Sequence, residues 1–210
     1  MADIAAMSAK RGQIYQVFIN IFMYLPDEKF LDYIKSEELK EFLGQLKALD
    51  YPIITKGINC ISGYIKALDS ASNTVEDLAV DRTKLLRVSN NEGLKMPYES
   101  QYSKDTKSTA SLLRLTGTYK KAGFVPATKE SPDFFCVQLD FMRVLSNRLA
   151  ENASQAKFIL SLQRDFLEEH LGKWISLYTK EAAQYADTDF YRGWLMILEG
   201  FIEIEKGYCK

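Results

Sequence analysis

Apolar side chains recur every three or four residues along almost the whole chain, and runs in which apolar and polar residues alternate are missing. The first spacing places apolar side chains on one face of an α-helix, whereas alternation is the pattern of a half-buried β-strand. Hydrophobic residues make up 47% of the 210 residues, which is enough for a substantial core. The sequence therefore predicts an all-α fold of about ten helices, in one globular domain over residues 1–210.

The expected helix boundaries coincide with capping residues, glycine and proline. Ser36 precedes two glutamates, as in a helix N-cap. Gly123 is expected to end one helix, and Ser131 and Pro132 are expected to cap and begin the next. The predicted helices lie at residues 5–25, 27–34, 37–49, 53–70, 75–88 and 104–121, from 131 onward, across 158–174, and at 188–206.

The apolar stretch from Ile14 to Leu25 follows Lys10 and Arg11, an order that also occurs in signal peptides. Polar residues interrupt this stretch, and no small-residue cleavage site follows it. We therefore interpret it as part of the first amphipathic helix. It is too short and too polar to span a bilayer, so direct membrane insertion is not expected.

Two segments lack a helical period and are predicted to be loops. Residues 89–103 contain two adjacent asparagines, a glycine and a proline, and residues 123–130 separate two predicted helices. Loops of this kind often carry function in a compact domain, so both are candidates for binding. Segment 89–103 is also a candidate hinge, which leaves open whether the protein is a monomer or a helix-swapped dimer.

The charge balance and the cysteines exclude several classes of protein. The 27 lysines and arginines nearly balance the 28 aspartates and glutamates, so no nucleic-acid partner and no anionic membrane is expected. Cys60, Cys136 and Cys209 are far apart and form no CxxC motif. This spacing argues against a disulfide framework, a zinc site and an iron–sulfur site, and it favours a reducing cytoplasm.

The sequence contains few of the residue sets that catalysis requires. His170 is the only histidine, and its position four residues before Trp174 favours a packed or hydrogen-bonded role within a helix. One histidine cannot supply the two Glu-x-x-His motifs of a helical carboxylate metal centre, and the glycine motifs of nucleotide sites are missing. We expect no catalytic residue, no metal and no cofactor, and hence a binding protein. A small helical hydrolase or carboxylate metalloenzyme around His170 is the remote alternative.

Three segments resemble motifs of the TorD/DmsD/NarJ family of redox-enzyme maturation chaperones. Residues 130–134 resemble the E-x-P-D-H signature, with Phe134 in place of its histidine. Residues 81–102 resemble the family's short helix and its P-x-E-S-x-Y loop, and residues 163–174 resemble its Q-x-x-F-x-x-x-H-L-x-x-W helix. The motif residues for which we expect structural roles are Leu139, Met142, Phe166, His170, Leu171 and Trp174.

This resemblance implies a cytoplasmic chaperone that binds the catalytic subunit of a DMSO-reductase-type molybdoenzyme, often through its twin-arginine leader. Such a chaperone assists cofactor insertion and delays export until the partner is folded. A leader offers two arginines followed by an apolar helical stretch, so its receptor needs carboxylates beside a hydrophobic groove. The candidate leader- or client-binding residues are Leu85, Leu86, Tyr98, Glu99, Tyr102, Phe124, Glu130, Pro132, Asp133 and Phe134.

Several of these residues also have a purely structural interpretation. Asp133 and Pro132 suit the first turn of a helix, and Leu85 and Leu86 suit a helical core. A second functional hypothesis within the same family is a client that lacks a twin-arginine leader. The chaperone would then recognise another amino-terminal segment or the apo-subunit itself.

Overall fold

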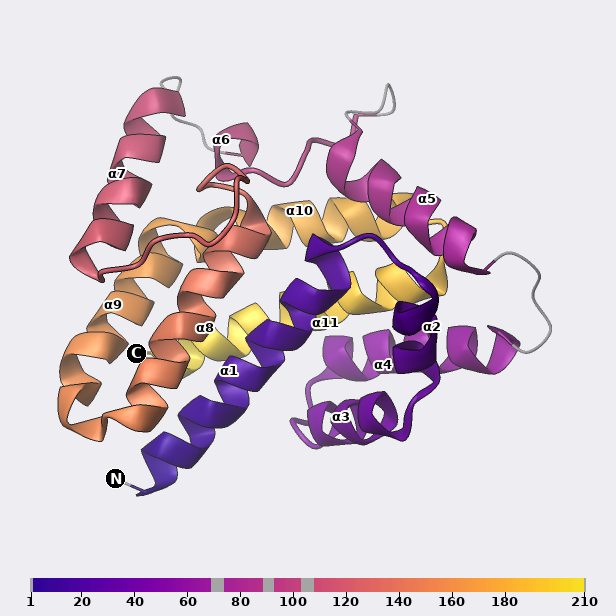
Figure 1. Cartoon of the computed structure of the whole chain (residues 1–210), viewed down its shortest axis with the longest axis horizontal. Helices are drawn as coiled ribbons and strands as arrows, with labels where there is room; N and C mark the ends of the chain where they lie inside the picture. Colours follow the sequence, from indigo (N-terminus) through magenta and orange to yellow (C-terminus); the bar gives the residue numbers. More distant parts are fainter. Residues whose placement is uncertain (1, 69–73, 89–92, 103–107, 210) are drawn as a thin grey trace. The chain divides into compact units, whose positions relative to one another are not determined.

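The computed structural model describes residues 2–68, 74–88, 93–102 and 108–209. These residues form eleven α-helices, one short 3-10 helix and no β-strand, so the predicted all-α fold is confirmed (Figure 1). The chain divides into two compact units. The first unit comprises Met1–Tyr24, Pro97–Ile175 and Glu205–Lys210, and the second comprises Leu25–Met96 and Ser176–Ile204. The expectation of one domain over residues 1–210 stays a prediction.

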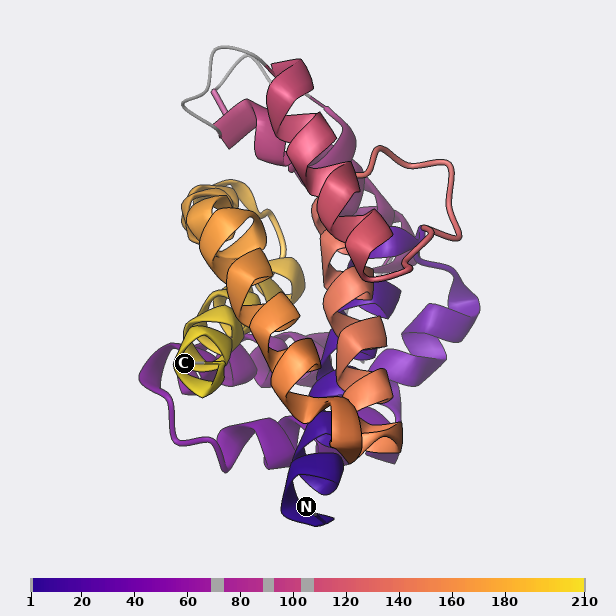
Figure 2. The same ribbon diagram turned by 90° about the vertical axis from the view of Figure 1, so that its left-hand side faces the viewer.

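The first unit is built around a long helix, α8, and an aromatic core. Helix α1 packs along α8, and the 3-10 helix η2 connects α8 to its neighbour α9 (Figure 2). The ring centroid of Phe141 on α8 lies 4.5 Å from that of Phe166 on α9 and 4.9 Å from that of Tyr119 on α7. The helices of this unit are α1 (Ala2–Met23), α6 (Glu99–Tyr102), α7 (Ser108–Lys121), α8 (Phe135–Glu151), η2 (Ala153–Gln155), α9 (Ala156–Glu169), the start of α10 (Leu171–Tyr185) and the end of α11 (Asp189–Tyr208).

The second unit contains α2 (Glu28–Lys35), α3 (Glu37–Lys47), α4 (Pro52–Ala67), α5 (Thr74–Arg87) and most of α10 and α11. The Ser36 hydroxyl accepts a hydrogen bond from the backbone N–H of Leu39, as predicted for an N-cap. The buried Asp81 carboxylate accepts bonds from the backbone N–H groups of Asp187 and Thr188, at 3.0 and 2.8 Å. Asp81 therefore ties α5 to the segment that begins α11.

The predicted helix start at Ser131 and Pro132 is wrong, because α8 begins at Phe135 with Phe134 as its N-cap. Phe134 forms an isolated antiparallel bridge with Tyr98. In addition, the N–H of Phe135 donates to the carbonyl of Pro97 at 3.1 Å. These contacts with a distant segment hold residues 131–134 in a turn outside the helix.

The single helix predicted across residues 158–174 is also wrong. Helix α9 ends before His170, whose φ of −127° and ψ of −104° are not helical, and α10 begins directly after it. A Cβ atom on Gly172 would lie 2.3 Å from the carbonyl oxygen of Leu167. Glycine therefore allows α10 to start close against the last turn of α9.

The two predicted loops are found with one addition. Residues 93–98 are not helical, but Glu99–Tyr102 forms the short helix α6. Gly123 has a φ of +60° just after α7, as expected of a left-handed helix end. Residues 89–92 and 103 of the first loop, 69–70 of one predicted helix, and 104–107 of another lie outside the described residues.

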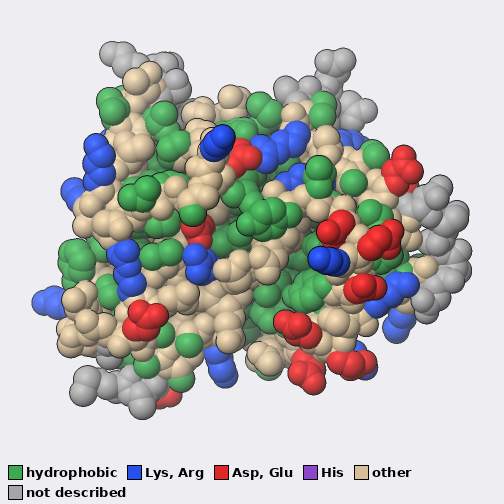
Figure 3. All heavy atoms as spheres, viewed as in Figure 1, with side chains coloured by type: hydrophobic (Ala, Val, Ile, Leu, Met, Phe, Trp, Pro, Cys, Tyr) green, Lys and Arg blue, Asp and Glu red, His purple; other side chains and the backbone are tan. Residues whose placement is uncertain are grey.

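The described part of the chain contains no helix that is both long and apolar enough to cross a membrane. Helix α1 includes most of the apolar stretch that resembles a signal peptide. On the face drawn in Figure 3, acidic and basic side chains lie interspersed with apolar ones. This distribution agrees with the nearly balanced charge of the sequence.

Candidate functional site

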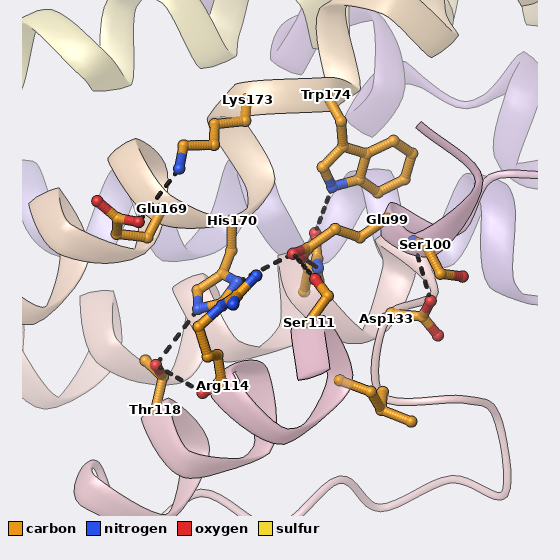
Figure 4. Close-up of polar contacts among 12 residues, drawn as sticks. Glu99, Ser100, Ser111, Arg114, Thr118, Asp133, Glu169, His170, Lys173 and Trp174 are labelled. Carbon is orange, nitrogen blue, oxygen red and sulfur yellow. Dashed lines mark hydrogen bonds and ion pairs between the residues drawn. The ribbon is translucent and has the colours of Figure 1, made fainter. Parts of the chain in front are cut away.

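The loop before α8 and the short helix α6 are joined through Asp133. The backbone N–H of Glu99 donates to the carbonyl oxygen of Asp133 at 3.0 Å. The N–H of Ser100 donates to the Asp133 carboxylate at 3.2 Å (Figure 4). The Ser131 hydroxyl donates to the same carboxylate. Asp133 thus caps a helix that lies more than thirty residues earlier in the sequence, instead of the helix that follows it.

The carboxylate of Glu99 lies at the centre of a buried polar cluster. Its Oε2 accepts a hydrogen bond from Nε2 of Gln138 at 2.6 Å, and its Oε1 accepts one from the Ser111 hydroxyl at 3.1 Å. Nδ1 of His170 lies 3.1 Å from the same Oε1 (Figure 4). Glu99 is 7% exposed and His170 is 4% exposed. We call Glu99, Ser111, Gln138, His170 and Trp174 the Glu99 cluster.

The break between α9 and α10 places the His170 side chain in this cluster. While Nδ1 faces Glu99, Nε2 lies 3.4 Å from the hydroxyl oxygen of Thr118 on α7. The imidazole also packs against the ring of Phe166, with centroids 5.3 Å apart. The histidine is therefore both packed and hydrogen-bonded, and it connects α7 to Glu99 at the start of α6.

Trp174 completes the cluster from α10. Its Nε1 donates to Oε1 of Gln138 at 3.0 Å, and its ring stacks on Tyr102 of α6 with centroids 5.4 Å apart. Gln138 thereby links Trp174 to Glu99. Sequence reasoning missed both Gln138 and Ser111. The sequence signal that could have indicated Gln138 is its position, because it is the one amide in the otherwise apolar run of residues 134–139. All six residues of this run are buried in the structure.

The segment at residues 123–130 is anchored at its start. Phe124 is buried against Tyr119 and Phe141, with centroids 5.0 and 5.3 Å apart. The Tyr119 hydroxyl donates to the carbonyl of Pro132 at 2.9 Å, and burial raises the pKa of this phenol well above its usual value. Arg148 donates to the carbonyl of Gly123 at 3.2 Å. The loop is therefore held against α7 and α8.

The predicted binding residues differ in how accessible they are. Leu85 and Leu86 belong to the second unit, where they are 1% and 0% exposed. The other eight lie in the first unit, and four of these are buried: Glu99, Phe124, Asp133 and Phe134. The remaining four, Tyr98, Tyr102, Glu130 and Pro132, are half-buried, and we call them the loop rim.

The apolar motif residues lie in the core. Leu139, Met142, Phe166 and Leu171 are fully buried in the first unit. No group of three or more histidine, cysteine, aspartate or glutamate side chains that could hold a metal ion occurs among the described residues.

Phe134 occupies the position of the family's signature histidine and is fully buried. Its ring centroid lies 5.4 Å from that of Tyr98 and 5.2 Å from that of Phe135. We expect Phe134→His to lower the free energy of unfolding by about 1–3 kcal/mol, because a polar ring would be buried among aromatic ones. Urea denaturation measures this change.

The control for this prediction is Phe134→Leu, which removes the ring but keeps the site apolar. Its expected cost is smaller, about 1 kcal/mol. A histidine variant as stable as the wild type would show that the site offers the imidazole a polar partner, and it would contradict the prediction.

The chain is similar to a known protein family and to individual chaperones. Residues 35–180 match the family described as nitrate reductase delta subunit. The chaperone protein TorD of Vibrio parahaemolyticus is 23% identical over 219 residues, which cover 99% of this chain and 98% of the relative. TorD of Vibrio vulnificus strain YJ016 is 25% identical over 215 residues, with the same coverage. No solved structure matches the chain significantly.

The family match over residues 35–180 places the chain among redox-enzyme maturation chaperones, a class of binding protein without catalytic function. The chain belongs to the nitrate reductase delta subunit family, which includes the NarJ and TorD chaperones. The resemblance drawn from the three motif segments is therefore confirmed.

Proposed function

We propose that this protein is a cytoplasmic chaperone for the catalytic subunit of a DMSO-reductase-family molybdoenzyme. It binds the apo-subunit and its twin-arginine leader, keeps the subunit competent for cofactor insertion, and delays export until folding is complete. The observation that carries this proposal is that the three motif segments meet around Glu99, in a chain similar to TorD chaperones over its full length. His170 reaches the Glu99 carboxylate, and Asp133 accepts hydrogen bonds from the backbone of Glu99 and Ser100.

The proposed mechanism is reversible binding, in which apolar contact supplies affinity and carboxylates supply selectivity for arginine. Glu99 and Asp133 are buried and engaged by backbone and side-chain donors, so they position the loops. The residues that contact the leader are those of the loop rim. Glu130 offers a carboxylate for a guanidinium. Tyr98 and Tyr102 pack on Phe134 and Trp174, and the exposed parts of their rings offer aromatic surface for a guanidinium or an apolar side chain.

The proposal is tested by capture of the client. The tagged protein is coexpressed with a candidate molybdoenzyme catalytic subunit, either intact or without its leader, and bound subunit is quantified. If the leader is the main contact, its deletion abolishes capture. If the client is recognised through its body, as in the alternative hypothesis, capture of the shortened subunit persists. Failure to capture either form would contradict the proposal.

Selectivity for arginine is tested with leader peptides. Replacing the two arginines of the peptide by lysines is expected to weaken binding by about tenfold, since an ammonium cannot form the paired hydrogen bonds of a guanidinium. Glu130→Gln is expected to reduce this difference between the two peptides. An arginine preference that is unchanged in the variant would remove Glu130 from the leader site.

A further inference from the structure

A groove with an apolar floor and a basic rim lies within the second unit. It encloses about 400 Å³ between α3 and α4, beside the end of α2. Its floor includes the buried side chains of Ile34, Leu43 and Ile58. Four exposed lysines lie around this floor: Lys35, Lys40, Lys47 and Lys66. The described residues that line the groove include no aspartate or glutamate.

The groove exists because α3 carries a glycine on the face that borders it. Lys40, Leu43, Gly44 and Lys47 follow the spacing of a single helix face. A Cβ atom on Gly44 would meet no other atom within 4 Å, so open space lies above this position. A larger side chain at Gly44 would occupy part of that space without displacing its neighbours.

We infer that this groove binds an acidic amphipathic helix of a partner protein. Aliphatic side chains of such a helix would contact the floor, and its glutamates or aspartates would face the lysines. The lysines are exposed at the rim, where charges steer and select a protein partner. The polar side chains of Ser36, Asn59 and Ser62 also line the groove, where they can form hydrogen bonds with polar side chains of a bound helix.

This inference goes beyond the proposed leader binding. A twin-arginine leader is basic, and a lining that holds four lysines and no acid disfavours it. One of these lysines, Lys40, also pairs with Glu37 outside the lining, at 3.1 Å. The groove is therefore assigned to a different part of the client or to another protein. The two proposals can fail separately, because one concerns a basic peptide and the other an acidic one.

The probe for the groove is a labelled synthetic peptide of about 18 residues, long enough to form a helix. It carries leucines at helical positions i, i+3, i+4 and i+7, flanked by glutamates. Its binding to the full chain is measured by fluorescence anisotropy. Gly44→Leu, which fills the groove, is expected to weaken binding by at least about tenfold.

Gly63→Leu is the matched control. Gly63 is also exposed, helical and open, with no atom within 4 Å of an added Cβ, but it does not line the groove. Both changes replace a helical glycine by a better helix former, so both proteins are expected to fold. The control is expected to bind the peptide as the wild type does.

The contribution of charge is tested in a second pair of variants. Lys47→Glu with Lys66→Glu is expected to weaken binding by about tenfold. Lys120→Glu with Lys121→Glu is expected to leave it unchanged. All four lysines are exposed and lie in the last turn of a helix, so any effect on helix ends is matched.

Three results would overturn the inference. The first is a wild-type protein that does not bind the acidic peptide, or binds it no better than a version with lysines in place of the glutamates. The second is equal binding by the Gly44→Leu and Gly63→Leu proteins. The third is self-association, measured by sedimentation, that Gly44→Leu abolishes, since a second copy would then be the occupant.

Discussion

Replacing Arg11 by alanine is expected to lower the free energy of unfolding by about 3–5 kcal/mol, because it leaves a buried carboxylate without its charged partner. Nε and Nη2 of Arg11 donate to the two carboxylate oxygens of Glu205, both at 2.6 Å. The two residues are 5% and 1% exposed. Without the guanidinium, Glu205 would keep only the Tyr15 hydroxyl among these donors, at 2.6 Å.

The same guanidinium holds several elements of the first unit together. Nη1 donates to Gln163 on α9 at 3.1 Å, and the ring of Tyr208 at the end of α11 lies 4.2 Å from the guanidinium carbon. Burial disfavours the charged form, but the hydrogen bond and charge of Glu205 outweigh it, so the pKa of Arg11 lies above its usual value. Burial also disfavours the charged form of the neighbouring Cys209, which is the thiolate. It raises the pKa of this thiol to about 11, so the thiol stays protonated at neutral pH.

Urea denaturation followed by circular dichroism measures the cost. The informative control is Arg11→Met combined with Glu205→Leu, which removes both charges and keeps apolar volume. Its cost should be well below that of Arg11→Ala, because no unpaired charge remains buried. A loss under about 1 kcal/mol for Arg11→Ala, the range of an exposed pair, would contradict the buried ion pair.

Glu99→Ala is expected to destabilise the protein by about 3 kcal/mol, since it removes the shared acceptor of a buried cluster. Gln138, Ser111 and His170 would each lose a partner at 2.6 to 3.1 Å. The change should also release α6 from α7, from α8 and from the His170 side chain, and with it the half-buried Tyr98 and Tyr102 of the loop rim. We therefore expect weaker leader binding at temperatures where the variant is still folded.

Two variants separate this effect from general damage at the loop. Glu99→Gln keeps the size and one acceptor oxygen, so an intermediate loss of stability is expected. Ser100→Ala keeps the backbone N–H that donates a hydrogen bond to Asp133. It should change the free energy of unfolding by less than about 0.5 kcal/mol. Urea denaturation ranks the three proteins. An alanine variant at Glu99 no less stable than Ser100→Ala would contradict the role of the cluster.

Local patterns were sufficient for most of the helices. Periodicity, the cap at Ser36 and the left-handed Gly123 predicted elements that the structure contains. The two wrong boundaries depend on contacts with distant residues. His170 keeps the four-residue apolar spacing although the helix breaks there, and the start of α8 is displaced by the pairing of Phe134 with Tyr98.

The site was less predictable than the helices, because its contacts join residues that are distant in the sequence. Motif resemblance found Glu99, Asp133, His170 and Trp174 but not the amide of Gln138 that connects two of them. The Arg11–Glu205 pair spans 194 residues of sequence, and no local pattern marks it. Glu99 and Asp133 are buried and hold the loops together, which agrees with the structural interpretation that was already open for Asp133. Their roles in binding stay predictions.

The most direct test of the central claim compares the affinity of the protein for one catalytic subunit in its apo and cofactor-loaded forms. Isothermal titration calorimetry with each purified form measures both dissociation constants. A maturation chaperone is predicted to bind the apo form at least about tenfold more tightly, since cofactor insertion must release it. Equal affinity for the two forms, or no binding to either, would contradict the claim.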